Sequence, residues 1–496
     1  MNDTKKTVTH PGDVASLKEI TKGCGIVAAA AWDFSAPGQV SFPDDDDSVE
    51  IQNGRLTKFA VFCSKLSDLS PLAGLTALTS LNLSGNKNLS DLSPLAGLTA
   101  LTTLTLFGNE TLSDLSPLAG LTALTTLTLS GKKNLSDLSP LTGLTKLGLG
   151  GNEINDLTPL AGLTALTELS LGENEINDLT PLAGLTALTE LSLGENEIND
   201  LSPLAKLTAL TELDLIDNEI SDLSPLAKLT ALTSLYLNKG RTNSGMISDL
   251  SPLAKLTALR ELDLTDNKIS DLSPLAKLTA LRELHLIENK ISDLSPLVEL
   301  SALTDLYLNG NEISDLSPLA ELTALTDLYL DGNEISDLTP LAELTALTDL
   351  YLRENKISDL SPLAKLTALR ELYLTENKIS DLSPLVELSA LTDLYLDGNE
   401  ISDLSPLAKL TALRKLHLTE NKISDLSPLA KLTALKKLYL SENDICDLSP
   451  LAELTALKIT HQSKYKISDL LSLLADTIGG NCIEIAAPTA KAMNRR

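Results

Sequence analysis

The stretch Asn152–Glu173 reads NEINDLTPLAGLTALTELSLGE, and Asn174–Glu195 repeats it letter for letter. The same theme returns about every 22 residues, with small changes, almost to the C-terminus. Five positions define the unit: Leu166, Leu169, Leu171, Asn174 and Ile176. One such unit is too short to enclose a core, so the pattern predicts a stack of units that bury one another's apolar residues.

The frame LxxLxLxxNxL/I at a period of about 20–29 residues is typical of a leucine-rich repeat. Apolar and polar residues alternate around Leu169 and Leu171, which predicts a short strand with one buried face. Asn174 follows, where its amide can pair with backbone groups that the turn leaves unsatisfied. Stacked once per repeat, these Asn residues should form a ladder. Ser202-Pro203 suits a helix start, with Ser as the cap and Pro in the first turn.

We therefore predict an α/β solenoid. It is a right-handed leucine-rich-repeat horseshoe or arc, with a parallel β-sheet on the concave face and short 3-10 or helical turns on the convex face. The repeats should cover residues 59–453, with Arg241–Gly245 as a small loop. Residues 454–496 should form a degenerate last repeat and a C-terminal cap, in which Thr460 and Gln462 stand at the strand-leucine positions.

The N-terminal residues lie outside the repeat. Residues 1–10 are polar and are predicted to be disordered. Residues 11–58 should form a cap, because an open solenoid end exposes apolar surface and a strand edge. In this cap, Asp13–Lys22 has apolar residues at helical spacing. Val49–Gln52 and Leu56–Val61 flank Asn53-Gly54, which predicts a β-hairpin with a type I′ turn.

Composition limits the partners. Asp plus Glu outnumber Lys plus Arg by 67 to 39, which gives a net charge of −28. This charge argues against nucleic acid and anionic membrane surfaces, and it permits basic partners. No apolar run is long enough for membrane insertion. These features favour a cytoplasmic location, with a secreted or cell-surface one as the alternative.

No cofactor, metal or catalytic site is predicted. The acidic run Asp44–Asp47 lacks the pattern of a calcium loop and is interpreted as a solvated turn. Of four His residues, His285 and His417 occupy the same repeat position, which describes a surface row rather than a general base. The four Cys residues, Cys24, Cys63, Cys446 and Cys482, lack zinc-site spacing. They are interpreted as free buried thiols, with one disulfide near each end as the alternative.

Two rows of side chains should line the concave face. The residue between the two strand leucines forms the central row, which holds seven of the eight Tyr residues. The residue before it forms a row that is acidic in the C-terminal half and turns basic at Lys415 and Lys437. The candidate binding residues are Tyr236, His285, Tyr307, Tyr329, Tyr351, Tyr373, Tyr395, His417, Tyr439, Asp305, Asp327, Asp349, Glu371 and Asp393.

Two interpretations of these rows are open. In one, Tyr side chains on neighbouring strands stack and stabilise an exposed sheet. In the other, the face binds a protein, because Tyr is enriched at interfaces. Adjacent carboxylates repel one another without an evident benefit for folding, which favours binding. A basic partner could then place Arg or Lys against the Tyr rings.

The repeat resembles that of bacterial internalins, whose pattern includes NxIsDLsPLxxLxxLxxLxL. Here the pattern runs from Asn218-Glu219-Ile220-Ser221-Asp222-Leu223-Ser224-Pro225-Leu226 to Leu237. The resemblance implies binding of host surface proteins through the concave sheet. It covers the repeat region only, since the signal peptide, immunoglobulin-like domain and LPxTG tail of internalins are not evident. A similar repeat occurs in the leucine-rich regulator of eukaryotic protein phosphatase one.

The functional hypothesis is a non-enzymatic, monomeric leucine-rich-repeat scaffold that binds a basic protein through its acidic, Tyr-lined concave face. One alternative is a secreted or surface-attached internalin-like adhesin. Another is a cytoplasmic subunit that resembles the phosphatase regulator.

Overall fold

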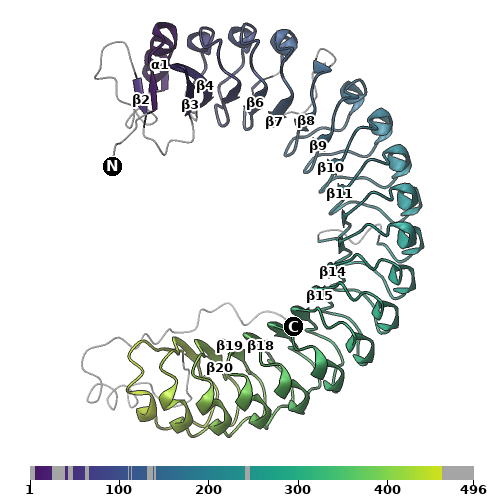
Figure 1. Ribbon diagram of the computed structural model, residues 1–496, viewed down its shortest axis with the longest axis vertical. Coiled ribbons are helices and arrows are strands. Elements are labelled where there is room, and N and C mark those ends of the chain that lie inside the picture. Colours follow the sequence, from purple (N-terminus) through teal and green to yellow (C-terminus); the bar gives the residue numbers. More distant parts are fainter. Residues whose placement is uncertain are drawn as a thin grey trace. The chain divides into compact units, whose positions relative to one another are not determined.

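The computed structural model describes residues 6–24, 40–42, 49–61, 66–109, 111–112, 114–130, 138, 141–240 and 246–460. The chain divides into two compact units, Met1–Met246 and Ile247–Arg496, and each is described by itself. In each unit, the strands line the inner wall of the arc and the 3-10 helices line the outer wall (Figure 1).

Each repeat whose strand and outer turn both lie among the described residues consists of one short strand and one 3-10 helix. The strands of the first unit after the hairpin are β5 Ser80–Asn82, β6 Thr103–Leu106, β7 Thr126–Leu129, β8 Lys146–Gly148, β9 Glu168–Ser170, β10 Glu190–Ser192, β11 Glu212–Asp214 and β12 Ser234–Tyr236. Those of the second unit are β13 Glu261–Asp263, β14 Glu283–His285, β15 Asp305–Tyr307, β16 Asp327–Tyr329, β17 Asp349–Tyr351, β18 Glu371–Tyr373, β19 Asp393–Tyr395, β20 Lys415–His417, β21 Lys437–Tyr439 and β22 Lys458–Thr460.

The 3-10 helices begin at the Ser-Pro or Thr-Pro of each repeat. They are Ser70–Leu72, Ser93–Leu95, Ser116–Gly120, Thr158–Leu160, Thr180–Gly184, Ser202–Lys206 and Ser224–Lys228 in the first unit. In the second unit they are Ser251–Lys255, Ser273–Leu275, Ser295–Leu297, Ser317–Leu319, Thr339–Glu343, Ser361–Lys365, Ser383–Glu387, Ser405–Lys409, Ser427–Lys431 and Ser449–Leu451. Each is too short for more than a turn or two, as predicted.

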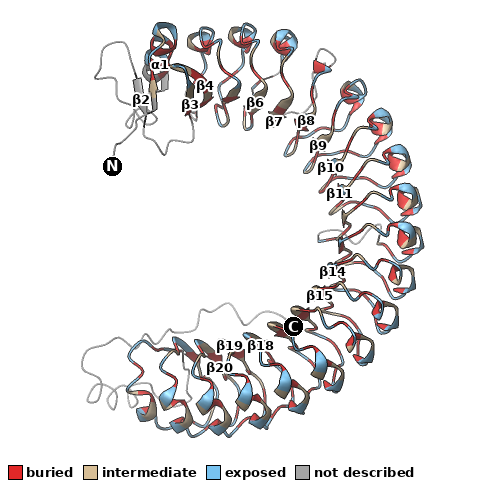
Figure 2. Cartoon of the chain, in the orientation of Figure 1, coloured by how far each residue is buried: buried red, intermediate tan, exposed pale blue. Residues whose placement is uncertain are grey.

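The core lies between the two walls and consists almost entirely of leucine and isoleucine. Strand leucines pair in register across neighbouring repeats, as Leu328 does with Leu350. Both are fully buried, and so is Ile335 at the frame position after the turn. Figure 2 shows this buried layer between the sheet and the exposed outer helices. Each buried Leu contributes about 1.5–3 kcal/mol, so the stacked repeats supply a core that no single repeat could build.

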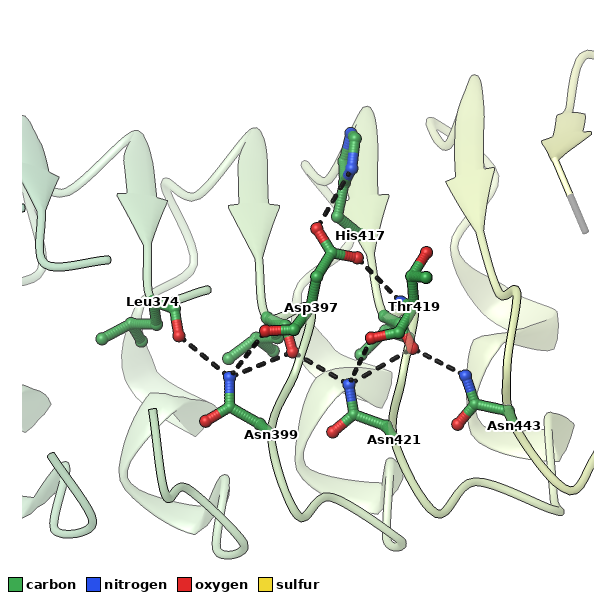
Figure 3. A network of polar contacts seen from close by, with 9 residues as sticks. Leu374, Asp397, Asn399, His417, Thr419, Asn421 and Asn443 are labelled. Carbon is green, nitrogen blue, oxygen red and sulfur yellow. Dashed lines mark hydrogen bonds and ion pairs between the residues drawn. The ribbon is translucent and has the colours of Figure 1, made fainter. Parts of the chain in front are cut away.

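The predicted Asn ladder is confirmed. Asn399 Nδ2 donates to the carbonyl of Leu374 in the preceding repeat at 2.9 Å and to that of Leu396 in its own repeat at 3.1 Å. Asn421 repeats the pattern one repeat further along (Figure 3). In return, Asn421 Oδ1 accepts the N–H of Ile401 at 3.0 Å. The ladder therefore closes the buried turn by linking neighbouring repeats.

The prediction that Ser caps each outer helix is wrong. The residue before the helix is a leucine, and no side chain makes the cap hydrogen bond there. Instead, Asp222 Oδ1 accepts the backbone N–H of Ser224 at 2.8 Å. This Asx turn is available because Asp can bond to its own backbone two residues on. The Asp of the DLSP motif therefore starts the helix, and it does so from two residues upstream.

The N-terminal helix and hairpin are present. Helix α1, Pro11–Cys24, buries Val14, Leu17 and Ile20. Strands β3, Val49–Gln52, and β4, Arg55–Ala60, pair antiparallel. Their turn has positive φ at Asn53 and Gly54, as a type I′ turn requires. Strand β4 also pairs with β5 in parallel, so the hairpin leads directly into the first repeat. The domain boundaries at 11–58, 59–453 and 454–496 stay predictions.

Three predictions need correction. Lys6–Val8 forms strand β1, which pairs with β2, Val40–Phe42, so these residues are not disordered. Ile459, rather than Thr460, occupies the strand-leucine position of β22 and pairs with Leu438, because this last interval is one residue short. Cys446 is exposed and not a buried thiol. The predictions on Asp44–Asp47, Arg241–Gly245, Cys63, Gln462 and Cys482, and on the side chain of Cys24, lie outside the described residues.

Candidate binding face

The central row of the sheet is assembled in register, as predicted. In the second unit it runs from Asp263 on β13 through His285 on β14 to Tyr439 on β21, one residue per strand. Tyr236 belongs to the first unit, where it pairs with Asp214. We call the row from His285 to Tyr439 the aromatic stack. Its members are His285, Tyr307, Tyr329, Tyr351, Tyr373, Tyr395, His417 and Tyr439.

The rings of the aromatic stack lie nearly parallel and face to face. Neighbouring centroids are 3.9–4.3 Å apart, and the interplanar angles run from 6° to 26°. The strand spacing of about 4.8 Å explains the contact, because equivalent side chains on adjacent parallel strands then meet. The rings are half-buried, and Tyr373 is only 8% exposed. The rings therefore stack, and their roles in stability and in binding stay predictions.

Stacking limits the directions from which a partner could approach the rings. Each inner ring is covered on both faces by its neighbours, so a partner's Arg or Lys has no free ring face to approach. The ring edges remain available, whereas hydroxyl groups such as that of Tyr373 already take part in hydrogen bonds within the face. Burial raises the pKa of the Tyr307, Tyr351 and Tyr373 hydroxyls above their usual value. They therefore stay neutral hydrogen-bond donors at physiological pH.

Beside the aromatic stack runs the acidic row Asp305, Asp327, Asp349, Glu371 and Asp393, also in register. The hydroxyl of Thr326 donates to Asp327 Oδ2 at 2.7 Å, and the equivalent Thr residues serve Asp305, Asp349 and Asp393. Glu371 Oε2 instead accepts the Tyr373 hydroxyl at 2.8 Å. Burial, together with the charges of Asp349 and Asp305, raises the pKa of Asp327. The folded chain thus disfavours the charged form of Asp327.

The row changes sign between β19 and β20. Lys415 Nζ lies 2.6 Å from Asp393 Oδ1, and Asp393 is nearly buried. Lys437 and Lys458 continue the same register row on β21 and β22, and both are exposed. The sequence had indicated this change at Lys415 and Lys437. Lys458 was missed because the shortened last interval hid its register.

A second row flanks the aromatic stack on the other side, just after each strand. Asp331 Oδ1 accepts the backbone N–H of Arg353 at 2.7 Å, and Asp397 Oδ1 accepts that of Thr419 at 2.7 Å. Asp397 Oδ2 also lies 3.5 Å from His417 Nδ1 (Figure 3). Asp331 and Asp397 therefore each accept a backbone N–H of the following repeat. Burial raises the pKa of Asp331, and the nearby Arg353 opposes the shift.

Arg353 lies alongside the aromatic stack. Its Cζ is 4.4 Å from the Tyr373 centroid and 6.0 and 5.7 Å from those of Tyr351 and Tyr395. The distances to Tyr351 and Tyr395 are nearly equal, so the guanidinium lies beside the Tyr373 ring at the edge of the stack and not between two rings. The repeat register alone does not reveal that the Arg353 side chain lies beside these rings.

The sheet face of the first unit has a different character. Small residues such as Thr128, Gly148, Ser170 and Ser192 form its central row and leave two adjoining hollows of about 310 and 450 Å³. Phe107, at their edge, is 55% exposed. Lys146 pairs with Glu168 within the first hollow. The face is therefore open and uneven, whereas the second unit presents a closed aromatic surface.

Parallel strands in register, outer 3-10 helices and a buried Asn ladder define a leucine-rich-repeat solenoid, a class that typically serves as a non-enzymatic scaffold for binding proteins. The chain matches the family described as Leucine Rich repeats (2 copies), and it belongs to that family. The matched residues are 55–97, 99–143, 142–184, 186–228, 208–255, 230–277, 257–299, 301–343, 345–387, 389–431 and 411–453.

Solved structures support an internalin-like repeat. An internalin (inlF) from Listeria monocytogenes is 37% identical, with a TM-score of 0.57, over 66% of this chain and 89% of that chain. The functional domain of InlJ from Listeria monocytogenes is 26% identical, with a TM-score of 0.56, over 67% and 70%. A leucine-rich-repeat protein from Leptospira interrogans is 25% identical, with a TM-score of 0.67, over 79% and 98%. No curated protein matches the chain.

Helix length bears on membrane association. Among the residues that the structure describes, none of the helices is long and apolar enough to cross a bilayer.

Proposed function

We propose that the chain is a monomeric, non-enzymatic scaffold that binds a basic protein on the sheet face of its second unit. The contact region comprises the acidic row and the exposed edges of the aromatic stack between β15 and β19. Tyr236, in the first unit, is not required for this contact. The aromatic stack supplies a rigid platform, and the carboxylates supply charge.

One observation carries the proposal. Asp305, Asp327 and Asp349 stand side by side on adjacent strands, and no Lys, Arg or His among the described residues forms an ion pair with them. Each carboxylate therefore repels its neighbours, and burial at Asp327 adds to the cost. A cationic partner would remove this repulsion on binding. A negative field over the sheet would also speed the approach of such a partner.

Arg353 supports the proposed contact. Its guanidinium rests beside Tyr373 and within the field of Asp331. The positions one and two repeats earlier in the same row are Asp331 and Asn309, which leave the sides of Tyr329 and Tyr307 without a guanidinium of this kind. A partner's Arg could lie there as Arg353 does next to Tyr373, on the side of the aromatic stack that carries Asp331 and opposite the acidic row.

The test is affinity capture on the immobilised full-length chain, followed by titration of the captured protein. Asp327→Asn with Asp349→Asn should slow association and flatten its salt dependence, because long-range attraction between charges is screened by salt. Tyr329→Ser with Tyr351→Ser should weaken binding with little change in salt dependence.

Ser170→Ala with Ser192→Ala, on the sheet face of the first unit, is the matched control and should leave affinity unchanged. Equal binding by the Asp pair variant and the wild type, over a range of salt concentrations, would contradict the proposal. Light scattering of the free chain tests the monomeric state.

The identity with the Listeria internalin favours a second candidate, a secreted or surface-attached adhesin. The competing alternative is a cytoplasmic regulatory subunit, which rests on the resemblance of the repeat to the phosphatase regulator. Fractionation of the native cells separates the two: an adhesin must be recovered from the surface or the medium, whereas a regulatory subunit must remain with the cytoplasm.

A further inference from the structure

We propose that the sheet face of the second unit recognises charge order: a basic block of the partner lies on β15–β18, and an acidic block of the same segment lies on β20–β22. This inference rests on the proposed function and goes beyond it, because a uniformly basic partner would use only part of the face.

The register row supplies the pattern. Asp305, Asp327, Asp349, Glu371 and Asp393 are followed without interruption by Lys415, Lys437 and Lys458. Lys437 lies between Lys415 and Lys458 on strands about 4.8 Å apart, so this part of the row is positive where the preceding part is negative. A ligand that carries the complementary blocks in the matching order meets both parts of the row.

The boundary between the blocks is already neutral. Asp393 and Lys415 form an ion pair at 2.6 Å, with the carboxylate nearly buried. The charges that remain for a partner therefore lie to either side. On one side are the carboxylates of β15–β17. On the other is Lys437, whose ammonium has no carboxylate within ion-pair distance among the described residues.

The aromatic stack continues beneath both blocks. Tyr395 stacks on His417 at 4.1 Å, and His417 stacks on Tyr439 at 3.9 Å, so the change of charge does not interrupt the surface. From β15 to β22, the row spans seven strand spacings, or about 34 Å, which an extended segment of about ten residues can follow. One continuous segment can thus contact both blocks.

The occupant to which we commit is a foreign protein segment with segregated charges. A second copy of this chain is the other occupant that could offer both signs, since the acidic block of one copy could meet the lysines of another. Light scattering of the free chain distinguishes the two.

Three synthetic peptides of equal length test the inference by calorimetric titration of the full chain. The first carries a block of Arg followed by a block of Glu, each interspersed with Ser. The second has the same residues with Arg and Glu alternating. The third keeps the Arg block and replaces each Glu with Ser. The block peptide should bind at least about five-fold more tightly than either of the others, because only it satisfies both charged stretches.

A charge-reversing variant locates the effect. Lys437→Glu with Lys458→Glu should reduce the affinity of the block peptide to that of the Arg–Ser peptide or below, while the Arg–Ser peptide keeps or gains affinity. Lys409→Glu with Lys431→Glu is the matched control. It changes the net charge equally on exposed residues of the outer helices, and it should leave the preference for the block peptide intact.

The outcomes separate the two proposals. Equal affinity for the block and alternating peptides, or equal behaviour of the two variants, would overturn the inference while the proposed basic partner stands. Failure of the Arg–Ser peptide to bind would overturn the proposed function as well. A dimer of the free chain that dissociates in Lys437→Glu/Lys458→Glu would identify a second copy as the occupant and overturn the foreign segment.

Discussion

The backbone N–H of Ile313 donates to Asn333 Oδ1 at 3.0 Å, across the boundary between one repeat and the next. The Nδ2 of the same Asn333 amide acts as a donor. It donates to the carbonyls of Leu308 at 3.0 Å and Leu330 at 3.1 Å. A single buried side chain thus satisfies donors and acceptors that belong to two repeats. A hydroxyl has only one hydrogen to donate and a carboxylate has none, whereas the Asn amide donates twice and accepts through a separate atom, which explains why Asn recurs at the position.

Replacing this amide should be costly. Asn333→Ala leaves several buried backbone groups without a partner and should lower the free energy of unfolding by about 1–3 kcal/mol. Urea denaturation followed by circular dichroism measures the loss. Glu334→Ala, at the exposed neighbouring position, removes only a surface ion pair with Lys356 and should change stability by less than about 1 kcal/mol. Equal stability of the two variants would refute the structural role of the ladder.

The residue before each ladder Asn adopts a left-handed backbone, with φ of 65° at Gly332 and 50° at Glu354. A side chain at such a φ costs about 1–2 kcal/mol. Gly332→Ala should therefore destabilise the protein by about that amount, and Glu354→Gly should stabilise it by somewhat less because Gly gains entropy in the unfolded chain. Gly162→Ala is the control: Gly162 is without a positive φ, and its added Cβ meets open space. Thermal denaturation of the three variants in parallel measures the differences.

Much of this fold follows from periodicity alone. The spacing of leucines fixes which residues share a strand, and one Asn per repeat identifies the buried turn. The register of the aromatic and acidic rows could therefore be predicted residue by residue. The family, the helix and the hairpin followed from the same kind of pattern.

The errors have identifiable physical causes. Ser-Pro suggested a Ser cap, yet Asp222 two residues earlier has the reach to bond the Ser224 N–H. The last repeat is one residue short, so counting by the regular period misplaced Thr460. The spacing of strands implies contact between Tyr rings, but the pattern of letters does not show whether the rings stack on their faces or stand apart. That choice depends on side-chain rotation, which periodicity leaves undetermined.

Two aspartates of neighbouring repeats should respond to pH in opposite directions. Hydrogen bonds from the Ser317 hydroxyl and backbone N–H lower the pKa of Asp315 in the folded chain. The charged carboxylate therefore stabilises the fold above pH 3.8, the ordinary pKa, and this stabilisation is lost as the pH falls through the lower pKa of the folded chain. Burial raises the pKa of Asp327 in the folded chain. The protonated carboxyl therefore favours the folded state below pH 3.8, the ordinary pKa, and this contribution is lost as the pH rises through the higher pKa of the folded chain.

At pH 7, Asp315→Asn should therefore lower the melting temperature and Asp327→Asn should raise it. Both differences from the wild type should fade as the pH is lowered towards 3. Differential scanning calorimetry between pH 3 and pH 7 gives both curves. A gain for Asp327→Asn that grew at low pH would mean that the carboxylate is stabilised rather than penalised by its surroundings.

The aromatic stack should contribute to stability whether or not it binds a partner. Tyr351 contacts Tyr329 at 4.2 Å and Tyr373 at 4.1 Å. Each such pair is worth about 0.5–1.5 kcal/mol beyond area burial. Tyr351→Ser should thus lose at least about 1–3 kcal/mol in urea denaturation. Tyr351→Phe keeps the stacked ring and gives up the hydroxyl contacts, a long one of 3.4 Å to Glu371 and those to Tyr329 and Tyr373, so it should lose less stability than Tyr351→Ser. A Ser variant as stable as the Phe variant would show that the stack adds nothing to folding.

The cap prediction depends on Asp13, a fully buried carboxylate of α1. Its Oδ2 accepts the backbone N–H of Leu56 at 3.0 Å, and its Oδ1 accepts from Arg55 Nη2 at 3.1 Å. These bonds tie the helix to the hairpin that begins the sheet. Asp13→Ala should cost about 3 kcal/mol, because both donors lose a charged acceptor in a buried position. Lys18→Ala, on the exposed side of the same helix, is the control for changes in α1 that leave the network intact.

Deletions test the same cap at larger scale. Removing residues 1–58 should expose the apolar end of the first repeats and a strand edge, and it should produce aggregates that are visible by size-exclusion chromatography with light scattering. Removing residues 1–10 should reduce stability, because Val8 is fully buried and the N–H groups of Thr9 and His10 donate to the Gly54 carbonyl at 2.9 and 3.1 Å. A soluble monomer of residues 59–496 with an unchanged melting temperature would show that α1 and the hairpin do not cover the end of the solenoid.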